Sequence, residues 1–588
     1  MQQNPARPHI AATYCGAMPD VPVPEVSPSR SNLRVPRRWW HLSRTGLLFG
    51  AAYFLTSMAP SLLPRTWYYQ GLISGLCAAV GYALGVLVSW VVRRISRLVD
   101  LHVTVSGEAR HWLLVAAPLF GAVAVLGLTV ANVRSQARTA AVVHLTPLTP
   151  LDWAMALALA AFVAVLFLVV ARGLRGATHQ LAEAAGHVLP RAIATVVAVL
   201  VVGLAAAWVT DSVLFHRTMQ AFAGVAAQGN TAPTGRPAPT SPLRSGGPGS
   251  LESYASLGYQ GQMFVTSAPT PPQITAATGR GAIEPIRVYA GRTGDRTVSD
   301  VADAVVAELK RTGAFQRHVL AVITTTGTGW VDDWSAQSIE YLSNGDSAIA
   351  AMQYSYLPSA MSMMTDRDTP REAGKALFDK VYAVWRTLPE GGRPQLVVGG
   401  ESLGSYGGQA AFADARDMLA RAQGGVWVGT PSFTDIAAQL TAERTPGSPE
   451  IVPVVDDGLH IRFAASGDQL THDYDGRDYG VWDFPRFVYA QHPSDPVVWW
   501  NPALLGAEPD WLREPRGRDV NPDVTWIPFV TFWQLTTDMA VGHDPPDGYG
   551  HRYGPELVPA WGSVLGGSPT DDYSKVVAGI EKTVNRVA

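Results

Sequence analysis

The stretch VVGGESLGSYGG, Val397–Gly408, is the part of the sequence that decides the fold of the second half of the chain. It reads as an apolar strand, one serine between two glycines, and small residues that open a helix. A G-x-S-x-G turn of this kind lifts the serine oxygen clear of a sheet, and its glycines let strand and helix approach closely. An ordinary Gly-rich turn is the alternative. The strand before it and the helix after it favour Ser402 as a nucleophile, with the N–H of Leu403 as an oxyanion donor.

Strands and helices alternate around this stretch. Predicted strands cover 285–290, 318–326, 347–357 and 395–400, and predicted helices cover 298–312 and 371–388. Strands that alternate with helices of about 10–15 residues are typical of βαβ units and a mostly parallel sheet. We therefore expect an α/β domain over residues 251–588.

A nucleophilic serine needs a histidine as its base. The histidines that follow Ser402 are His460, His472, His492, His543 and His551. The first three stand in a strand-like run, in an acidic turn and directly before the best acid candidate, which disfavours them. The last two share the Gly/Pro loop VGHDPPDGYGHRYG, after a predicted last strand at Thr525–Leu535. His551 precedes the final helix and is the preferred base, with His543 as the alternative.

The acid that orients the histidine has two candidates. Asp495 follows a strand in RFVYAQHPSDPVVWW, and Asp468 follows another apolar strand in FAASGDQL. A carboxylate at a strand end orients an imidazole and stabilises its cation, although Asp is also common as a turn cap. We prefer Asp495, with Asp468 as the runner-up.

The loop TTTGTGWVDD follows the strand predicted to lie beside the nucleophile strand. A Gly-rich loop there supplies a second oxyanion donor, for which Gly327 and Thr328 are the candidates. The GTG run is too short for a phosphate-binding fingerprint, and the sequence carries no HExxH motif or Cys/His cluster. We therefore expect neither a cofactor nor a metal.

The first half of the chain contains five runs without Asp, Glu, Lys or Arg: 46–63, 71–92, 112–133, 153–171 and 192–209. Each is close to the roughly 20 residues that a helix needs to cross a bilayer. They predict a bundle of five transmembrane helices, and hence a multi-pass protein of the cell membrane.

Arginine is unevenly distributed around these runs. It is frequent before the first run and in the second and fourth connections, and sparse in the first and third. Positive charge stays cytoplasmic, so the N-terminus is predicted inside and, after five spans, the α/β domain outside the cytoplasm. The predicted division is a disordered tail (1–43), a membrane domain (44–215), a Pro/Gly/Ser-rich linker (216–250) and the α/β domain (251–588).

The overall composition excludes some classes of function. Net charge is -3, which gives no electrostatic case for nucleic acid. Hydrophobic residues make up 47% and charged residues 16% of the chain, a balance that fits a membrane protein. The two cysteines, Cys15 and Cys77, lie far from Ser402, so they build no disulfide framework around it. The sequence leaves the oligomeric state open.

Several phrases carry a resemblance to a known group: LGYQGQMFV, PIRVYAG, TGTGWVD, QYSYLPS, GGESLGSYGG, QHPSDPVVWW and GHRYG. From the first span to the last helix, the chain is similar to the actinobacterial membrane-anchored α/β-hydrolase family. The resemblance implies an α/β-hydrolase domain and serine-dependent ester chemistry at Ser402, Asp495 and His551. Similar sequences often read GHGH in the last loop. Here Tyr549 replaces the first histidine of that pattern, and His543 lies outside it.

These features together predict a membrane-anchored serine esterase or lipase. Membrane helices concentrate an enzyme at lipid substrates, and the tryptophan-rich segment 499–533 suits an interface or an acyl pocket. The expected substrate is therefore an acyl ester of a membrane or envelope lipid. A lipid acyltransferase with the same three residues is the first alternative. A hydrolase-like binding module without catalysis is the second.

Overall fold

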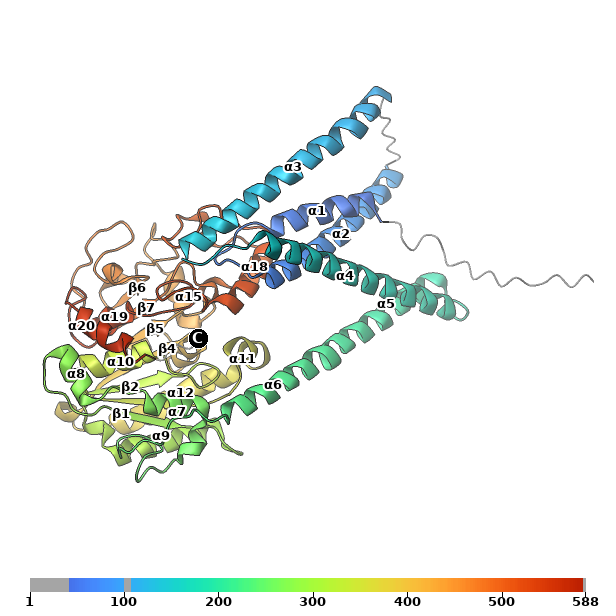
Figure 1. Ribbon diagram of the computed structural model, residues 1–588. Coiled ribbons are helices and arrows are strands. Elements are labelled where there is room, and N and C mark those ends of the chain that lie inside the picture. The colour runs from blue at the N-terminus through green and yellow to red at the C-terminus, as the bar shows by residue number, and fades with distance from the viewer. Residues whose placement is uncertain (1–41, 100–106, 585–588) are drawn as a thin grey trace, which may run out of the picture. The chain divides into compact units, whose positions relative to one another are not determined.

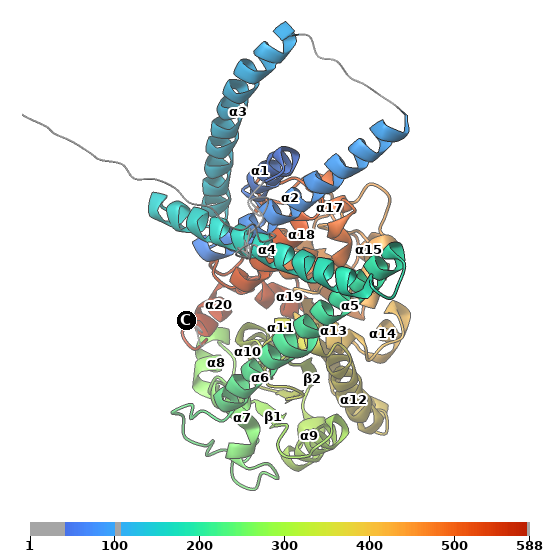
Figure 2. The same ribbon diagram turned by 90° about the vertical axis from the view of Figure 1, so that its right-hand side faces the viewer.

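The computed structural model describes residues 42–99 and 107–584 of the chain. The predicted disordered tail therefore lies outside the described residues except at its last two positions. Figure 1 shows the described helices and strands, and Figure 2 shows the same chain from a second direction.

The C-terminal domain is built on a seven-stranded sheet in the order β1-β3-β2-β4-β5-β7-β6, with every neighbouring pair parallel. The strands are β1 (Ile286–Ala290), β2 (Val319–Thr324), β3 (Ser347–Met352), β4 (Gln395–Glu401), β5 (Gly424–Val428), β6 (Ile461–Ala464) and β7 (Arg486–Ala490). Strand β4, which precedes Ser402, is central, with Gly400 between Thr324 of β2 and Trp427 of β5. The predicted α/β fold is confirmed.

Helices cover both faces of this sheet (Figure 1). They include α9 (Val298–Thr312) and α12 (Asp368–Trp385) on one face, and α10 (Asp333–Leu342) and α19 (Leu557–Val564) on the other. Along β2, Leu320 and Val322 face the first pair, whereas Ala321 and Ile323 face the second. This alternation within a wholly buried strand is expected for a parallel sheet between two helical layers.

Local sequence sets the ends of these helices. Helix α9 begins with a capping box, in which Thr297 accepts from the backbone N–H of Asp300 and the Asp300 carboxylate accepts from the N–H of Thr297. It ends at Gly313, whose φ of 70° is the left-handed conformation that glycine adopts readily. The observed helix has the predicted bounds.

Three features of the domain differ from the sequence predictions. The run predicted as the last strand, 525–535, is instead largely helical, as α18 (Val530–Asp538). Its residues are mostly apolar, so their period could not separate a strand from a buried helix. Strand β5 was not predicted, and the single helix expected after Ser402 is two, α13 (Leu403–Gln409) and α14 (Ala415–Arg421).

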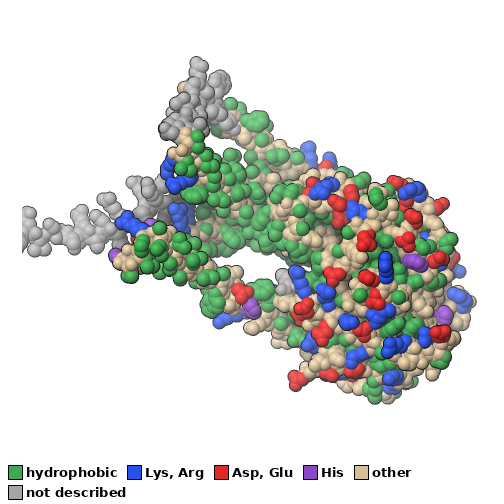
Figure 3. Space-filling model, turned by 180° about the vertical axis from the view of Figure 1, so that it is seen from behind, with side chains coloured by type: hydrophobic (Ala, Val, Ile, Leu, Met, Phe, Trp, Pro, Cys, Tyr) green, Lys and Arg blue, Asp and Glu red, His purple; other side chains and the backbone are tan. Residues whose placement is uncertain are grey.

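The N-terminal region is helical. Its helices are α1 (Arg44–Ser57), α2 (Trp67–Leu98), α3 (Gly107–Val142), α4 (Pro150–Ala185), α5 (Arg191–Trp208) and, after a π-helical turn at Val209–Phe215, α6 (His216–Asn230). Among the described residues four helical segments are long and apolar enough to cross a membrane: 67–98, 118–142, 150–185 and 191–230. Apolar side chains dominate these helices, whereas charged ones are spread over the C-terminal domain (Figure 3).

The first of the five predicted spans, 46–63, contains a shorter helix than expected. Helix α1 has 14 residues, which at 1.5 Å per residue is about 21 Å and short of a bilayer core of about 30 Å. The residues after it form an irregular connection to α2. Five spans therefore remain a prediction, while four apolar helices are observed.

The segment predicted as a Pro/Gly/Ser-rich linker, 216–250, is helical up to Asn230, and its later part runs along the edge strand β1. Ser245 is fully buried, donates its hydroxyl to Glu308 and accepts the backbone N–H of Tyr289. These contacts attach the segment to the sheet, and its Pro/Gly composition gave no sign of them.

Candidate active site

Ser402 occupies the sharp turn between β4 and α13. Its backbone has φ 56° and ψ −121°, a conformation that is strained for a residue with a side chain. Its N–H donates to the carbonyl of Val428 at 2.9 Å, which ties the turn to β5. The turn also depends on Gly404, because a Cβ there would lie 2.3 Å from the carbonyl oxygen of Thr324. Strand and helix approach as closely as the G-x-S-x-G pattern predicts.

His551 and Asp495 form a direct pair. His551 Nδ1 lies 2.7 Å from Asp495 Oδ2, and the two side chains are 3% and 0% exposed. An ionised carboxylate only accepts hydrogen bonds, so Nδ1 carries the proton of this contact. In the neutral ring Nε2 is then the unprotonated nitrogen, the form that a general base requires.

The turn that carries Ser402 and the loop that carries His551 lie at the same edge of the sheet. Gly429 directly follows β5, and a Cβ placed on it would lie 2.5 Å from His551 Cε1. The preceding residue, Val428, accepts the N–H of Ser402. Asp495 follows β7, the neighbour of β5 on its other side. The three predicted residues therefore converge at the carboxyl ends of β4, β5 and β7.

Tyr553 makes a second contact with Asp495 that the sequence did not predict. Its hydroxyl donates to Asp495 Oδ2 at 2.9 Å and accepts the backbone N–H of His492 at 3.1 Å. The Tyr553 ring also stacks on His492, with centroids 4.1 Å apart. Asp495 Oδ1 meanwhile accepts the N–H of Val497 at 2.8 Å. Both carboxylate oxygens are thus held in place.

Both ring nitrogens of His492 face acceptors. Its Nδ1 lies 2.9 Å from the carbonyl of Gly550 and its Nε2 3.0 Å from Glu556 Oε1, an arrangement that favours the doubly protonated ring. Burial alone would lower the pKa of His492, but the hydrogen bond and negative charge of Glu556 outweigh it and raise that pKa. The ion pair fixes a backbone carbonyl one residue before His551.

The backbone N–H of the same glycine is also held. Gly550 donates to Ser494 Oγ at 2.8 Å, and Ser494 in turn donates to the buried Asp519. The segment 491–496 therefore binds the segment 549–553 through backbone and side chain alike. His492 and Ser494 of the first segment stand in the phrase QHPSDP, and Tyr553 of the second stands in GHRYG. Their place in these phrases is the one signal of their role in the sequence.

The alternative base and acid are placed less well. The His543 ring lies 5.1 Å from the His551 ring, but Asp495 bonds to His551. Desolvation, with His551 nearby, lowers the pKa of His543 to about 4. His543 is nevertheless exposed, so its lowered pKa is the weaker reason against it as the base. The stronger reason is that Asp495 bonds to His551 and not to His543. Asp468 is exposed, in the short turn Gly467–Leu470 after β6.

The remaining downstream histidines have partners elsewhere. His460 contacts the carbonyl of Asp483, and His472 pairs with Asp478.

The predicted oxyanion donors lie in the two segments next to the Ser402 turn. Leu403 is the first residue of α13, and the loop with Gly327 and Thr328 follows β2, the neighbour of β4. Gly404 lies against the carbonyl of Thr325, at the start of that loop. The N–H of Gly327 makes a long bond of 3.4 Å to Ser359 Oγ in this structure. An incoming oxyanion would have to replace that weak contact.

Two buried carboxyls lie behind Ser402. Glu401 and Asp332 line one small enclosed space beside Gly400. Burial raises the pKa of Asp332 to about 7, and burial together with the charges of Asp332 and Asp495 raises the pKa of Glu401 well above its usual value. The neutral acid is therefore favoured at Glu401.

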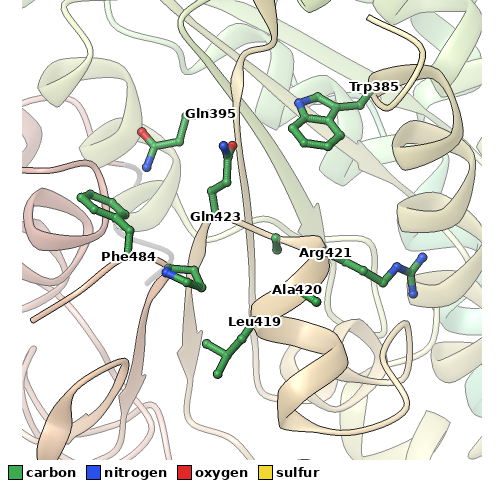
Figure 4. Close-up of a pocket in the computed structure, with 9 residues that line it drawn as sticks. Trp385, Gln395, Leu419, Ala420, Arg421, Gln423 and Phe484 are labelled. Carbon is green, nitrogen blue, oxygen red and sulfur yellow. The ribbon is translucent and has the colours of Figure 1, made fainter. Parts of the chain in front are cut away.

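One cavity lies away from this site. It has a volume of about 380 Å³ and is lined by residues that include Gln395, at the start of β4, and Gln423, just before β5 (Figure 4). Both positions are at the amino ends of the strands, opposite Ser402. Among the described residues no group of three or more His, Cys, Asp or Glu is arranged to hold a metal.

Family models match most of the chain. The model described as "Alpha/beta-hydrolase family" matches residues 286–575, and "Alpha/beta-hydrolase family N-terminus" matches residues 58–269. The chain belongs to this α/β-hydrolase family. The matches agree with the parallel sheet and support hydrolase chemistry, and the first of them contains Ser402, Asp495 and His551.

Comparisons with individual proteins add little. A search of the curated proteins found no match. Among solved structures, a Trichoderma reesei cutinase in complex with a C11Y4 phosphonate inhibitor matches with 14% identity. The match covers 42% of this chain and 85% of the cutinase, with a TM-score of 0.18. A similarity of that size carries no argument about this chain.

Proposed function

We propose that this α/β-hydrolase is a membrane-anchored serine ester hydrolase with Ser402 as nucleophile, His551 as base and Asp495 as acid. The observation that carries the proposal is the buried 2.7 Å contact between His551 and Asp495, at the sheet edge where the strained Ser402 turn ends β4. A histidine oriented in this way accepts a hydroxyl proton at its other nitrogen.

The reaction follows from these roles. Ser402 Oγ attacks the ester carbonyl while His551 Nε2 takes its proton, and the carbonyl oxygen becomes an oxyanion. His551 then gives the proton to the leaving alcohol as the carbon–oxygen bond breaks, which leaves an acyl-enzyme. Water repeats the sequence and releases the acid. Asp495 keeps the imidazole oriented and stabilises its cation.

Backbone N–H groups stabilise the oxyanion in this proposal. The donors are Leu403, at the start of α13, and Gly327 or Thr328 in the loop after β2. Such fixed donors are worth about 10²–10³ in rate for each one because they need no reorganisation during the reaction.

The substrate that we propose is an acyl ester of a membrane or envelope lipid. The four long apolar helices support a location in the membrane. The tryptophan-rich segment is also shared with the N-terminal region, since Trp499 and Trp511 pack in one apolar cluster with Leu62. Trp533 packs on Ile73 and Cys77 of α2. These contacts support an active site that works close to the bilayer.

We propose that the catalytic domain lies outside the cytoplasm. It contacts the connection between α1 and α2 and the end of α3, through bonds such as Leu63 to Asp538 and Ser135 to Asp523. These ends adjoin the arginine-poor connections, whereas the arginines of 93–97 and 172–175 lie toward the opposite ends of α2 and α4. Positive charge marks the cytoplasmic side, which supports this orientation. A phosphatase fused after Val209 should be active; an inactive, well-expressed fusion would contradict the proposal.

Lipid analysis tests the reaction and substrate together. Cells with the wild-type enzyme should contain a free fatty acid that is lost in cells with Ser402→Ala at equal expression. Loss of an acylated product instead would identify the transacylase. Identical lipid profiles would reject the lipid substrate, and equal hydrolysis of a small chromogenic ester by both purified proteins would reject Ser402.

A further inference from the structure

The connection between α1 and α2, residues 58–66, is buried in the C-terminal domain. Leu62 and Leu63 are 0% and 1% exposed. The N–H of Leu63 donates to Asp538 Oδ2 at 3.3 Å, and Gln534 donates its side-chain amide to the carbonyl of Ala59 at 2.9 Å. Both partners belong to α18, the helix that precedes the loop of His551.

Leu63 also packs against the loop that carries His551. It shares an apolar cluster with Val541, and a Cβ on Gly550 would lie 3.5 Å from Leu63 Cδ1. Gly550 is the residue before His551. A side chain from the N-terminal region therefore packs against the residue that directly precedes His551.

A second contact comes from the end of α3. His144 Nε2 lies 3.0 Å from the hydroxyl of Tyr549, and their rings meet edge to face at 4.9 Å. Tyr549 pairs with Arg552 across a tight turn whose two central residues are Gly550 and His551. The turn that carries the base is thus held from two connections of the membrane helices.

Polar contacts fix the same surface further away. Asn521 donates to the carbonyl of Ser135 and to the hydroxyl of Thr139, and Asp523 accepts from Ser135 at 2.7 Å. A tether that only localises an enzyme needs none of these matched pairs. Buried hydrogen bonds of this kind hold two elements in one register, because each broken pair would leave a desolvated polar group.

We propose that the α1–α2 connection and the end of α3 are part of the active-site support, with Leu63 and Tyr549 as positioning residues for His551. This role rests on the proposed function of His551 as base. It makes catalysis dependent on the packing of the N-terminal helices against the catalytic domain. A base displaced by about 1 Å costs on the order of 10²-fold in rate, so a modest loosening of the turn has a large effect.

The test uses the full-length protein in detergent and a fluorophosphonate probe, which reacts with a serine that a positioned histidine activates. Two quantities are measured, the rate constant of labelling and the fraction labelled at completion. A positioning role changes the rate constant. A role in folding alone changes the fraction of competent enzyme and leaves the rate constant of the remainder unchanged.

Leu63→Ala should slow labelling about tenfold or more with complete final labelling, and Leu63→Met, which conserves volume, should restore the rate to within about threefold. Leu48→Ala, at a site 68% exposed on α1, is the matched control and should label like wild type. An unchanged rate constant for Leu63→Ala, with or without a smaller labelled fraction, would overturn the positioning role.

Tyr549→Phe gives the same answer should Leu63→Ala fail to fold. It removes only the hydroxyl that bonds to His144 and should slow labelling about threefold, with His144→Ala adding little to it in the double variant. Rates equal to wild type would overturn the proposal. Failure of wild type itself to label, with the protein folded, would instead overturn the function of the site on which it rests.

Discussion

The two halves of the candidate active site are held in different ways. Ser402 is positioned by the strand β4 before it and the small residues after it, which pack against the neighbouring strands β2 and β5 of the sheet. His551 is positioned by contacts with segments far away in the chain: Asp495 precedes it by 56 residues, and Leu63 belongs to the N-terminal region. The position of Ser402 is therefore set by the sheet, whereas the position of His551 is set by contacts between segments far apart in the chain.

This difference predicts how each half fails. The serine side is rigid, because steric contacts with backbone leave its turn one conformation. The loop of His551 is held by hydrogen bonds and by the packing of Leu63. A single substitution can remove each of these contacts. Variants on the serine side should therefore cost stability, and variants on the histidine side should cost rate.

The largest effect is expected from Asp495→Asn. The amide keeps the shape of the side chain but offers an N–H to His551 Nδ1 in one of its orientations, which favours the wrong tautomer. The turnover number should fall by about 10⁴ at neutral pH, measured with a soluble ester substrate. Asp468→Asn is the control and should retain wild-type turnover. A loss at Asp468 in place of Asp495 would reverse the assignment of the acid.

On the serine side, Gly404→Val should destabilise the fold. Its Cβ would meet the carbonyl of Thr324 at 2.3 Å, and backbone on both sides leaves little room to move. The expected cost is about 1–3 kcal/mol or more in the free energy of unfolding, read from thermal or denaturant melts. Gly391→Ala, which meets no atom within 4 Å, should have little effect. Equal melting of Gly404→Val and wild type would contradict the rigid elbow.

On the histidine side, Tyr553→Phe should lower turnover with a smaller change in stability. It removes the hydrogen bond that holds Asp495 Oδ2 beside His551, so the imidazole is oriented less firmly and a rate loss of about tenfold is expected. Tyr382→Phe, on α12, is the matched control. Tyr553→Phe with wild-type turnover would show that Asp495 needs no second donor.

The smallest effect concerns pH. Glu556 raises the pKa of His492 in the folded protein above its value of about 6.5 in the unfolded chain. The folded state then binds the proton more tightly, so this stabilisation is complete below about pH 6.5 and is lost as pH rises through the folded pKa. Melts from pH 6 to 9 should show a steeper decline for wild type than for Glu556→Gln. Parallel curves would contradict the ion pair.

The sequence predicts the serine side well because its information is local. The apolar run, Gly400 and Gly404 specify a strand, a close approach and a turn within a few positions. The parallel sheet and the bounds of α9 follow from alternation and capping in the same way. Asp495 and His551 are predicted because each occupies a polar loop after an apolar run, although the strand predicted before His551 is the helix α18.

The support of the base could not be predicted from the sequence. Tyr553 and His492 matter through a hydrogen bond and a stacked pair that depend on two loops meeting across β7 and the last part of the chain. Leu63 is one leucine among many in an apolar run, and only its burial against α18 and Gly550 separates it from a lipid-facing neighbour. Such roles depend on long-range contacts, which local pattern does not encode.

The central claim is that Ser402 is the activated nucleophile, and mapping a covalent adduct tests it most directly. The full-length protein is treated with a fluorophosphonate, digested and analysed by mass spectrometry. We expect one adduct, on Ser402, that is absent in Ser402→Ala and strongly reduced in His551→Ala. An adduct on another serine, such as the buried Ser405 three positions later, or persistent labelling of folded Ser402→Ala, would contradict the account.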